Sequence, residues 1–224
     1  MIAKGKLICF IGIDGSGKTT LARDVVKYIN NTNSSAKYVY GRFQLYLAKP
    51  VVLLGNKLLL RKVNINDDYI KYTSKKKILF ANNKILSNIY LYFLLLDYLL
   101  QLIIKVKIPY FLGNTIICDR YIYDTIVTDF SVDMDLNADN LKHLINMCFI
   151  FVPKPSMAFL IDIPEDVAFN RKDDVPSLFY LKDRRAIYNE LAKYYDMQIL
   201  NGNKSREEVL SDCIERLKDE FEFL

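Results

Sequence analysis

Short apolar runs separated by longer amphipathic stretches recur along the chain. The apolar runs have strand length and cover residues 6–13, 37–43, 115–118, 157–163 and 197–200. Helical periodicity occupies residues 18–29, 75–105, 138–149, 177–195 and 205–223. Pro164 and Glu165 begin a further helix, and Ser205 is a suitable cap for the last one. Strands that alternate with helices predict a parallel sheet covered on both faces, with ligands at the carboxyl ends of the strands.

The pattern is less regular between the second and third strands. Residues 45–60 are mixed apolar and predicted helical, with breaks at Pro50 and Gly55, and residues 61–72 are a polar loop. No internal repeat or linker divides the chain. We therefore expect residues 1–224 to form a single domain of the α/β class, with three α/β/α layers and a five-stranded parallel sheet.

One segment has the pattern of a phosphate-binding loop, G-x-x-x-x-G-K-[ST], between the first strand and the first helix. It comprises Gly12, Asp14, Gly15, Ser16, Gly17, Lys18, Thr19 and Thr20. Glycines let backbone N–H groups surround an anion at a helix N-terminus, Lys18 can reach the β- and γ-phosphates, and the Thr19 hydroxyl can ligate Mg²⁺. The pattern predicts binding of ATP and Mg²⁺, with the Lys18 side chain exposed to the ligand rather than buried.

Composition restricts the partners of such a domain. The net charge is +5, but lysines and arginines are spread along the chain without a nucleic-acid-binding motif, so no nucleic-acid partner is expected. The four cysteines are far apart, which indicates buried thiols in a reducing compartment and predicts a cytoplasmic protein. A strand is predicted within a few residues of the N-terminus, so no signal peptide is expected.

Residues 85–104 are strongly apolar and require a membrane test. Asn88, Asp97 and Gln101 interrupt the stretch, and its uninterrupted part is shorter than the roughly 20 residues that span a bilayer. The segment therefore predicts a helix buried in the core, or at a homodimer interface, rather than a membrane span.

Three further clusters carry candidate chemistry. Asp119, Arg120 and Tyr121 directly follow the third strand, where Asp119 can hold Mg²⁺ and Arg120 can brace a phosphoryl group. Arg42 and Phe43 end the second strand, and Arg42 could clamp an acceptor phosphate. A charged lid segment spans about residues 168–180, where Arg171 could bring positive charge to the transferred phosphoryl group.

Together these residues resemble the thymidylate kinase family of P-loop nucleoside monophosphate kinases. The resemblance covers nearly the whole chain, including the segment at residues 201–205. It implies that Asp14 approaches the acceptor sugar and the metal, and that Arg42, Asp119 and Arg120 organise the acceptor phosphate and Mg²⁺. Phe43 and Tyr121, next to these arginines, are expected to bind the acceptor as well. It also implies that Asn203 lies beside the adenine of ATP. The expected reaction transfers a phosphoryl group from ATP to a monophosphate, with dTMP as the expected acceptor.

The chain departs from the family pattern on the acceptor side. Leu94 and Tyr98 stand where the family has an aromatic that stacks on thymine and an arginine for its phosphate. Asp124 replaces a serine, and Thr128 replaces a bulkier residue beside the sugar 2′ position. Two alternatives follow. One is a related kinase for a hydroxyl acceptor, a nucleoside or sugar, with Asp14 or Asp124 as base. The other is a regulator that binds ATP without phosphoryl transfer.

Overall fold

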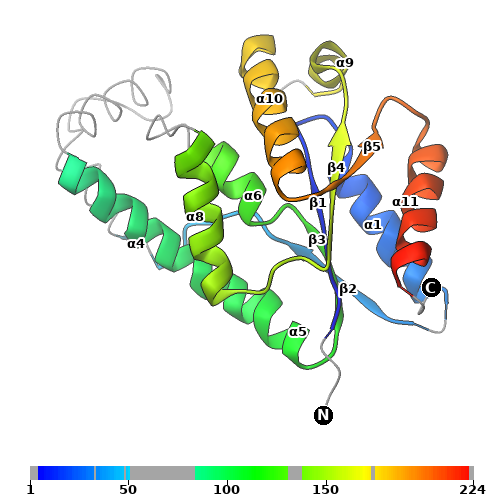
Figure 1. Ribbon diagram of the computed structural model, residues 1–224, viewed down its shortest axis with the longest axis horizontal. Coiled ribbons are helices and arrows are strands. Elements are labelled where there is room, and N and C mark those ends of the chain that lie inside the picture. Colours follow the sequence, from blue (N-terminus) through cyan, green and yellow to red (C-terminus); the bar gives the residue numbers. More distant parts are fainter. Residues whose placement is uncertain are drawn as a thin grey trace.

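The computed structural model describes residues 5–32, 34–47, 49–50, 84–130, 138–172 and 175–221. Its centre is a parallel sheet with the strand order β2-β3-β1-β4-β5 (Figure 1). The strands are β1 (Leu7–Ile11), β2 (Ala36–Tyr40), β3 (Thr115–Asp119), β4 (Met157–Asp162) and β5 (Gln198–Asn201). All five predicted strands are present, and the predicted P-loop α/β/α fold is confirmed.

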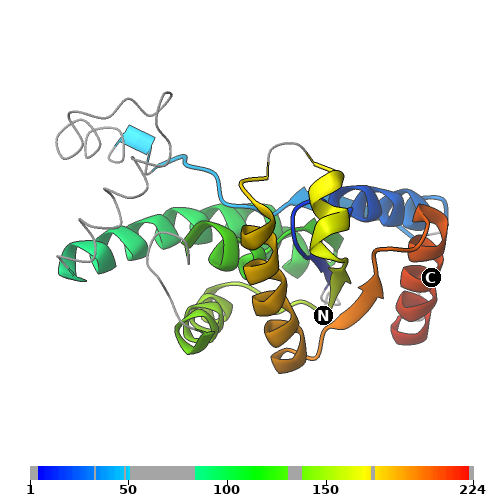
Figure 2. The ribbon, with the colours of Figure 1, turned by 90° about the horizontal axis from the view of Figure 1, so that it is seen from above.

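Helices cover both faces of the sheet, as Figures 1 and 2 show. One face carries α1 (Lys18–Asn30) and α11 (Arg206–Glu220). The other carries α4 (Lys84–Leu102), α6 (Ile122–Thr125), α8 (Ala138–Phe151) and α10 (Leu178–Tyr194). The shorter α5 (Ile108–Phe111) and α9 (Glu165–Asn170) follow the π-helical turn Ile103–Lys107 and β4 respectively. A second π-helical turn, Ile126–Phe130, extends α6.

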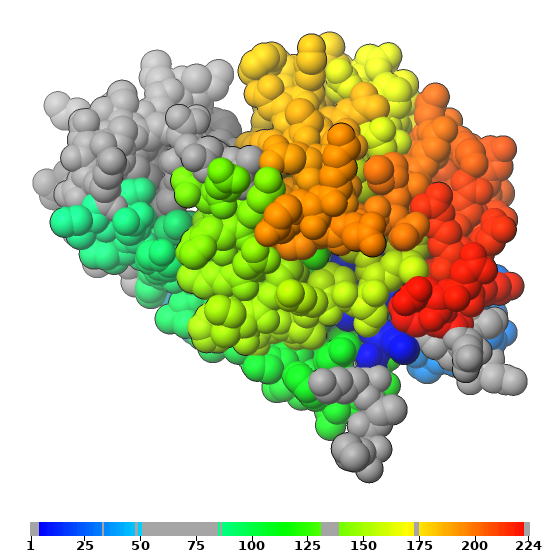
Figure 3. Space-filling model, in the orientation of Figure 1, coloured from blue at the N-terminus to red at the C-terminus, as the bar shows by residue number. Residues whose placement is uncertain are grey.

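Alternation along β1 divides the core into two parts. Leu7, Cys9 and Ile11 pack under α4, α8 and α10, whereas Ile8 and Phe10 pack under α1 and α11. Every residue of β1 is buried, which is typical of a central parallel strand covered on both faces. In the space-filling view, α8, α10 and α11 occupy much of the visible surface, and little of the blue N-terminal strand can be seen (Figure 3).

Local capping agrees with the predicted ends of the last two long helices. The Ser177 hydroxyl accepts a hydrogen bond from the Tyr180 N–H, which caps α10. Ser205 and Glu208 form a reciprocal capping box at α11. All four cysteines are buried and unbridged, which confirms the prediction of buried thiols.

One face of α4 and its continuation is apolar and exposed. The exposed side chains recur every three or four residues, at Ile85, Ile89, Tyr92, Leu96, Leu100, Ile104 and Ile108. Among the described residues, Ser87–Phe111 is the one helix long and apolar enough to cross a membrane, and half of its most apolar window is buried inside the protein. A core helix passes the same test, so the predicted homodimer and the predicted absence of a membrane partner stay predictions.

Part of the sequence-based interpretation lies outside the described residues. This holds for most of the helix predicted at residues 45–60, for the loop at 61–72, for the start of the helix at 75–105 and for residues 173–174 of the lid segment.

Candidate active site

The phosphate-loop sequence occupies the turn between β1 and α1, as predicted. Gly12, Gly15 and Gly17 have φ angles of +146°, +86° and +91°, conformations that side chains with a Cβ rarely adopt. A Cβ on Gly15 would lie 2.4 Å from the carbonyl oxygen of Ala168 in α9. Glycine is therefore required here both by backbone conformation and by the close approach of the helix that begins the lid segment.

The side chain of Lys18 is enclosed by its own loop. Its amine donates to the carbonyl oxygens of Gly12 and Ile13, both at 2.7 Å, and the residue is only 3% exposed. The expectation of an exposed lysine is therefore wrong. Burial lowers the pKa of Lys18 to about 8, against the opposing effect of nearby carboxylates such as Asp124. The lysine thus holds the loop together at the position where a phosphate would bind.

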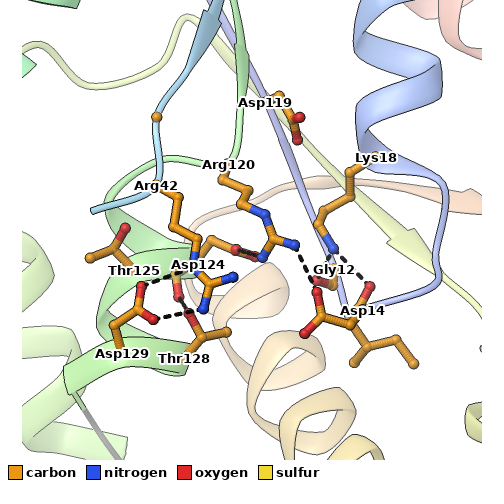
Figure 4. Close-up of polar contacts among 12 residues, drawn as sticks. Gly12, Asp14, Lys18, Arg42, Asp119, Arg120, Asp124, Thr125, Thr128 and Asp129 are labelled. Carbon is orange, nitrogen blue, oxygen red and sulfur yellow. Dashed lines mark hydrogen bonds and ion pairs between the residues drawn. The ribbon is translucent and has the colours of Figure 1, made fainter. Parts of the chain in front are cut away.

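Asp119 ends β3 beside Lys18, as Figure 4 shows. One carboxylate oxygen accepts a hydrogen bond of 2.7 Å from the Tyr38 hydroxyl on β2. The other, Oδ1, is buried and has no hydrogen-bond partner among the described residues. A fully buried carboxylate with an unpartnered oxygen suits a hard cation, and the partly exposed Thr19 supplies the second oxygen donor that the phosphate-loop pattern predicts. These two residues fit a Mg²⁺ ion held mainly by substrate phosphates.

The described residues contain no group of three or more His, Cys, Asp or Glu side chains that would hold a metal by themselves.

Arg120 lies at the centre of a buried charge network (Figure 4). Its guanidinium donates to Asp14 Oδ1 at 2.7 Å through Nη2 and to Asp124 Oδ2 through Nη1. The backbone at Arg120 has a left-handed φ of 65°, and its N–H donates to the Phe10 carbonyl at 3.0 Å. A left-handed non-glycine residue directly after a strand is typical of functional sites, because the surrounding structure must enforce it.

Asp14 connects the phosphate loop to this network. Burial would raise the pKa of Asp14, but the positive charges of Lys18 and Arg120 lower it to about 2. Lys172 of the lid segment lies 3.9 Å from the same carboxylate oxygen. Three cationic side chains from three parts of the chain thus surround one aspartate of the phosphate loop.

Arg42 forms a second ion pair next to Arg120 (Figure 4). Its Nη2 lies 2.8 Å from Asp129 Oδ1, and its Nε donates to Asp129 Oδ2 at 3.3 Å. The neighbouring Phe43 N–H donates to the Thr125 hydroxyl at 3.2 Å. The segment after β2 is therefore fixed against α6 and the π-helical turn. Arg42 lies at the same carboxyl-terminal edge of the sheet as Arg120.

A cavity of about 220 Å³ lies on the other side of the phosphate loop. Its lining includes Ser16, Gly17, Thr20, Arg171 and Gly202. The Arg171 guanidinium donates to the Gly202 carbonyl at 3.2 Å. Asn203, the next residue, is exposed, and its N–H donates to the Asn201 side chain at 3.0 Å. The lid arginine and the segment after β5 thus meet beside the phosphate loop, at a place suited to the nucleoside of ATP.

Besides Arg120 and Asp124, four residues predicted to contact the acceptor have buried side chains. Leu94 and Tyr98 are 5% and 1% exposed, and the Tyr98 hydroxyl donates to the Gly41 carbonyl. The Tyr121 hydroxyl donates to the Pro153 carbonyl, and that of Thr128 donates to the Asp124 carbonyl. These contacts are structural, and contact between these four residues and an acceptor stays a prediction.

Asp129 is the main site residue that the sequence interpretation missed. The sequence interpretation predicts no element between Tyr121 and Ala138, although Ile122, Ile126 and Phe130 have helical spacing. That spacing is the signal that could have predicted a helical segment carrying Asp124 and Asp129, although not the residues that they contact.

No family model matches the chain. A probable thymidylate kinase 1 of Saccharolobus solfataricus is 27% identical, over 93% of this chain and 95% of that protein. A probable thymidylate kinase of Pyrococcus horikoshii is 25% identical, over 97% of this chain and 98% of that protein. A thymidylate kinase of Plasmodium falciparum is 24% identical, over 99% of this chain and 96% of that protein. The chain is therefore similar along nearly its whole length to proteins named as thymidylate kinases.

Proposed function

We propose that this protein is a phosphotransferase of the thymidylate kinase family, which uses ATP and Mg²⁺ to phosphorylate a nucleoside monophosphate, dTMP being the preferred acceptor. The observation that carries the proposal is the position of Arg42 and Arg120 beside the phosphate loop, opposite the cavity lined by Arg171 and Gly202. A donor site and an acceptor site on either side of one loop are what transfer between two nucleotides requires.

In this proposal the chain acts by positioning and by charge. The glycines of the loop and the N-terminus of α1 hold the ATP phosphates, and Lys18 exchanges the Gly12 and Ile13 carbonyls for a phosphate oxygen. Thr19 and Asp119 hold Mg²⁺, which when bound neutralises charge on the phosphates. Arg42 and Arg120 orient the acceptor phosphate, and Arg171 contributes charge from the lid segment.

No general base is needed for this transfer. An oxygen of the acceptor phosphate is already ionised, so it attacks the γ-phosphorus directly while the bond to the bridging oxygen breaks and ADP leaves. The products are ADP and the nucleoside diphosphate.

The structure gives no support to a hydroxyl acceptor. Such a reaction requires a carboxylate that is placed to accept the hydroxyl proton, whereas the Asp14 carboxylate is already paired with Arg120 at 2.7 Å. Asp124 is completely buried between Arg120 and Tyr188. A regulator that only binds ATP would have no use for the paired arginines at the acceptor side.

The direct test measures ADP release by a coupled assay in the presence of Mg²⁺·ATP. The panel contains dTMP, dUMP, the other common monophosphates, thymidine and simple sugars. We expect turnover with dTMP and weaker turnover with dUMP. Turnover with thymidine or a sugar alone would identify a hydroxyl-acceptor kinase, and ATP binding without turnover on any acceptor would identify a regulator.

Lys18→Ala tests the phosphate-loop assignment within the same assay. Loss of a charge-assisted contact to the transferring phosphate should lower kcat/KM about a hundredfold or more. Lys142→Ala is a matched control, since this lysine lies on α8, pairs with Glu190 at 2.6 Å and does not line the cavity. Activity of Lys18→Ala within about threefold of wild type would contradict the assignment.

A further inference from the structure

Asp124 makes two side-chain contacts that leave it no route to a substrate. It is 0% exposed. Its Oδ1 accepts a hydrogen bond of 2.5 Å from the Tyr188 hydroxyl on α10, and its Oδ2 is paired with Arg120 Nη1. Tyr188 is itself 1% exposed. Burying an unpaired carboxylate would cost free energy, so Asp124 depends on its two partners. In return, its two oxygens hold the Tyr188 hydroxyl and the Arg120 guanidinium in place.

The contacts of Asp124 continue into the phosphate loop. Arg120 joins Asp124 through Nη1 to Asp14 through Nη2, so its guanidinium is held from two directions (Figure 4). The chain of contacts therefore runs from α10 through α6 to the end of β3 and then to the loop between β1 and α1. Nothing else in the described residues fixes the two Nη atoms of Arg120.

We propose that Asp124 and Tyr188 are positioning residues, which hold the Arg120 guanidinium in the orientation that binds the acceptor phosphate. The inference rests on the proposed function, since it requires an acceptor that carries a phosphate. The Tyr188 hydroxyl fixes Asp124, and Asp124 then fixes the plane of the guanidinium. Charge-assisted hydrogen bonds of this kind are directional, so loss of one loosens Arg120 without removing its charge.

The test is the contribution of the phosphate group to acceptor binding. Calorimetry gives the Kd of thymidine and of dTMP, and the ratio of the thymidine Kd to the dTMP Kd isolates the phosphate contacts. Tyr188→Phe removes only the hydroxyl and keeps the buried ring. We expect this variant to reduce the ratio about tenfold, while thymidine and Mg²⁺·ATP bind as in wild type. The KM for dTMP should rise, and the KM for ATP should not.

Tyr195→Phe is the matched control, because its hydroxyl contacts Lys142 and Asn146 at the far end of α10. Asp124→Asn is the second variant, in case Tyr188→Phe does not fold. It keeps the side-chain shape, loses the charge opposite Arg120 and should reduce the ratio by a similar factor. A merely structural role would weaken ATP and thymidine binding together with dTMP binding.

The outcomes are distinguishable. A wild-type protein that binds no monophosphate overturns the proposed function, and the positioning role with it. A wild-type protein that binds dTMP far better than thymidine, together with variants that keep this ratio, overturns the positioning role alone. Variants that bind dTMP, thymidine and Mg²⁺·ATP more weakly to the same extent also overturn the positioning role.

Discussion

Replacement of Asp129 by Asn should strengthen acceptor binding, although Asp129 lies inside the candidate site. The Asp129 carboxylate occupies Arg42 through two contacts, at 2.8 and 3.3 Å. An acceptor phosphate would use the same guanidinium, so it must compete with Asp129 or share Arg42 with it. Asparagine keeps the side-chain size and removes the competing charge.

The magnitude follows from the exposure of the pair. The side chains of Arg42 and Asp129 are 35% and 22% exposed, so solvent screens much of their attraction. Solvent-exposed ion pairs of this kind have an interaction free energy of up to about 1 kcal/mol. Removing such a competing interaction corresponds to about a fivefold change in a binding constant. We therefore expect the Kd and the KM of dTMP to fall by about fivefold in Asp129→Asn.

Stability should not suffer from the same change. Burial raises the pKa of Asp129, even with Arg42 beside it. The folded protein thus favours the protonated form more than the unfolded chain does, and the charged form reduces stability once the pH exceeds the unfolded pKa. At neutral pH, Asp129→Asn should therefore leave the melting temperature unchanged or raise it.

Calorimetric titration of dTMP and steady-state kinetics test this prediction. Asp139→Asn is the control, since it makes the same change of charge at a position that is 93% exposed. The double variant Arg42→Ala/Asp129→Asn completes a double-mutant cycle. When Arg42 is already replaced, Asp129→Asn should give no gain in dTMP affinity. Weaker dTMP binding in Asp129→Asn would refute the reasoning and show that Asp129 orients Arg42 rather than competing with the substrate. A benefit that persists without Arg42 would refute it equally.

Two further predictions concern the phosphate loop and the donor cavity. The folded pKa of Asp14 is about 2, below its unfolded value of 3.8, so its stabilising contribution is present above about pH 4 and is lost as the pH falls toward 2. Asp14→Asn should thus lower the melting temperature at pH 7, and the difference from wild type should shrink across that acid range; a constant difference would contradict this. Arg171→Ala should weaken ATP at least severalfold and leave dTMP binding unchanged, because Arg171 lines the cavity with Gly202. Equal weakening of both ligands in equilibrium titrations would place Arg171 elsewhere in the site.

The fold was predictable because it depends on local signals. Each strand is a short apolar run, and β1 is apolar at every position because both of its faces are covered. The glycines of the phosphate loop are equally local, since their left-handed φ angles follow from the turn that they make. The burial of Lys18 was not predictable in the same way. A lysine that bonds two carbonyls of its own loop has the same sequence pattern as one that extends into solvent.

The acceptor side was only partly predictable because it is assembled from distant elements. Arg42 and Arg120 were identified as candidates, yet their partners could not be read from spacing. Asp129 lies 87 residues from Arg42 along the chain, and Tyr188 lies 64 residues from Asp124. The π-helical turn Ile126–Phe130 also changes the angular positions of Thr128 and Asp129 relative to a regular helix. Sequence periodicity alone therefore could not assign these residues to their contacts.

The carboxylates on the acceptor side are expected to have two different effects, which depend on the arginine that each of them contacts. Arg42 and Arg120 face three carboxylates, those of Asp14, Asp124 and Asp129. Asp14 and Asp124 both hold Arg120, so removing either loosens the group expected to bind phosphate. Asp129 holds Arg42 in a more exposed position, where we expect competition with the acceptor phosphate to outweigh orientation of Arg42. Removing a carboxylate beside Arg120 should therefore weaken a phosphorylated acceptor, while removing the one beside Arg42 should strengthen it, and this opposition distinguishes positioning from competition within one site.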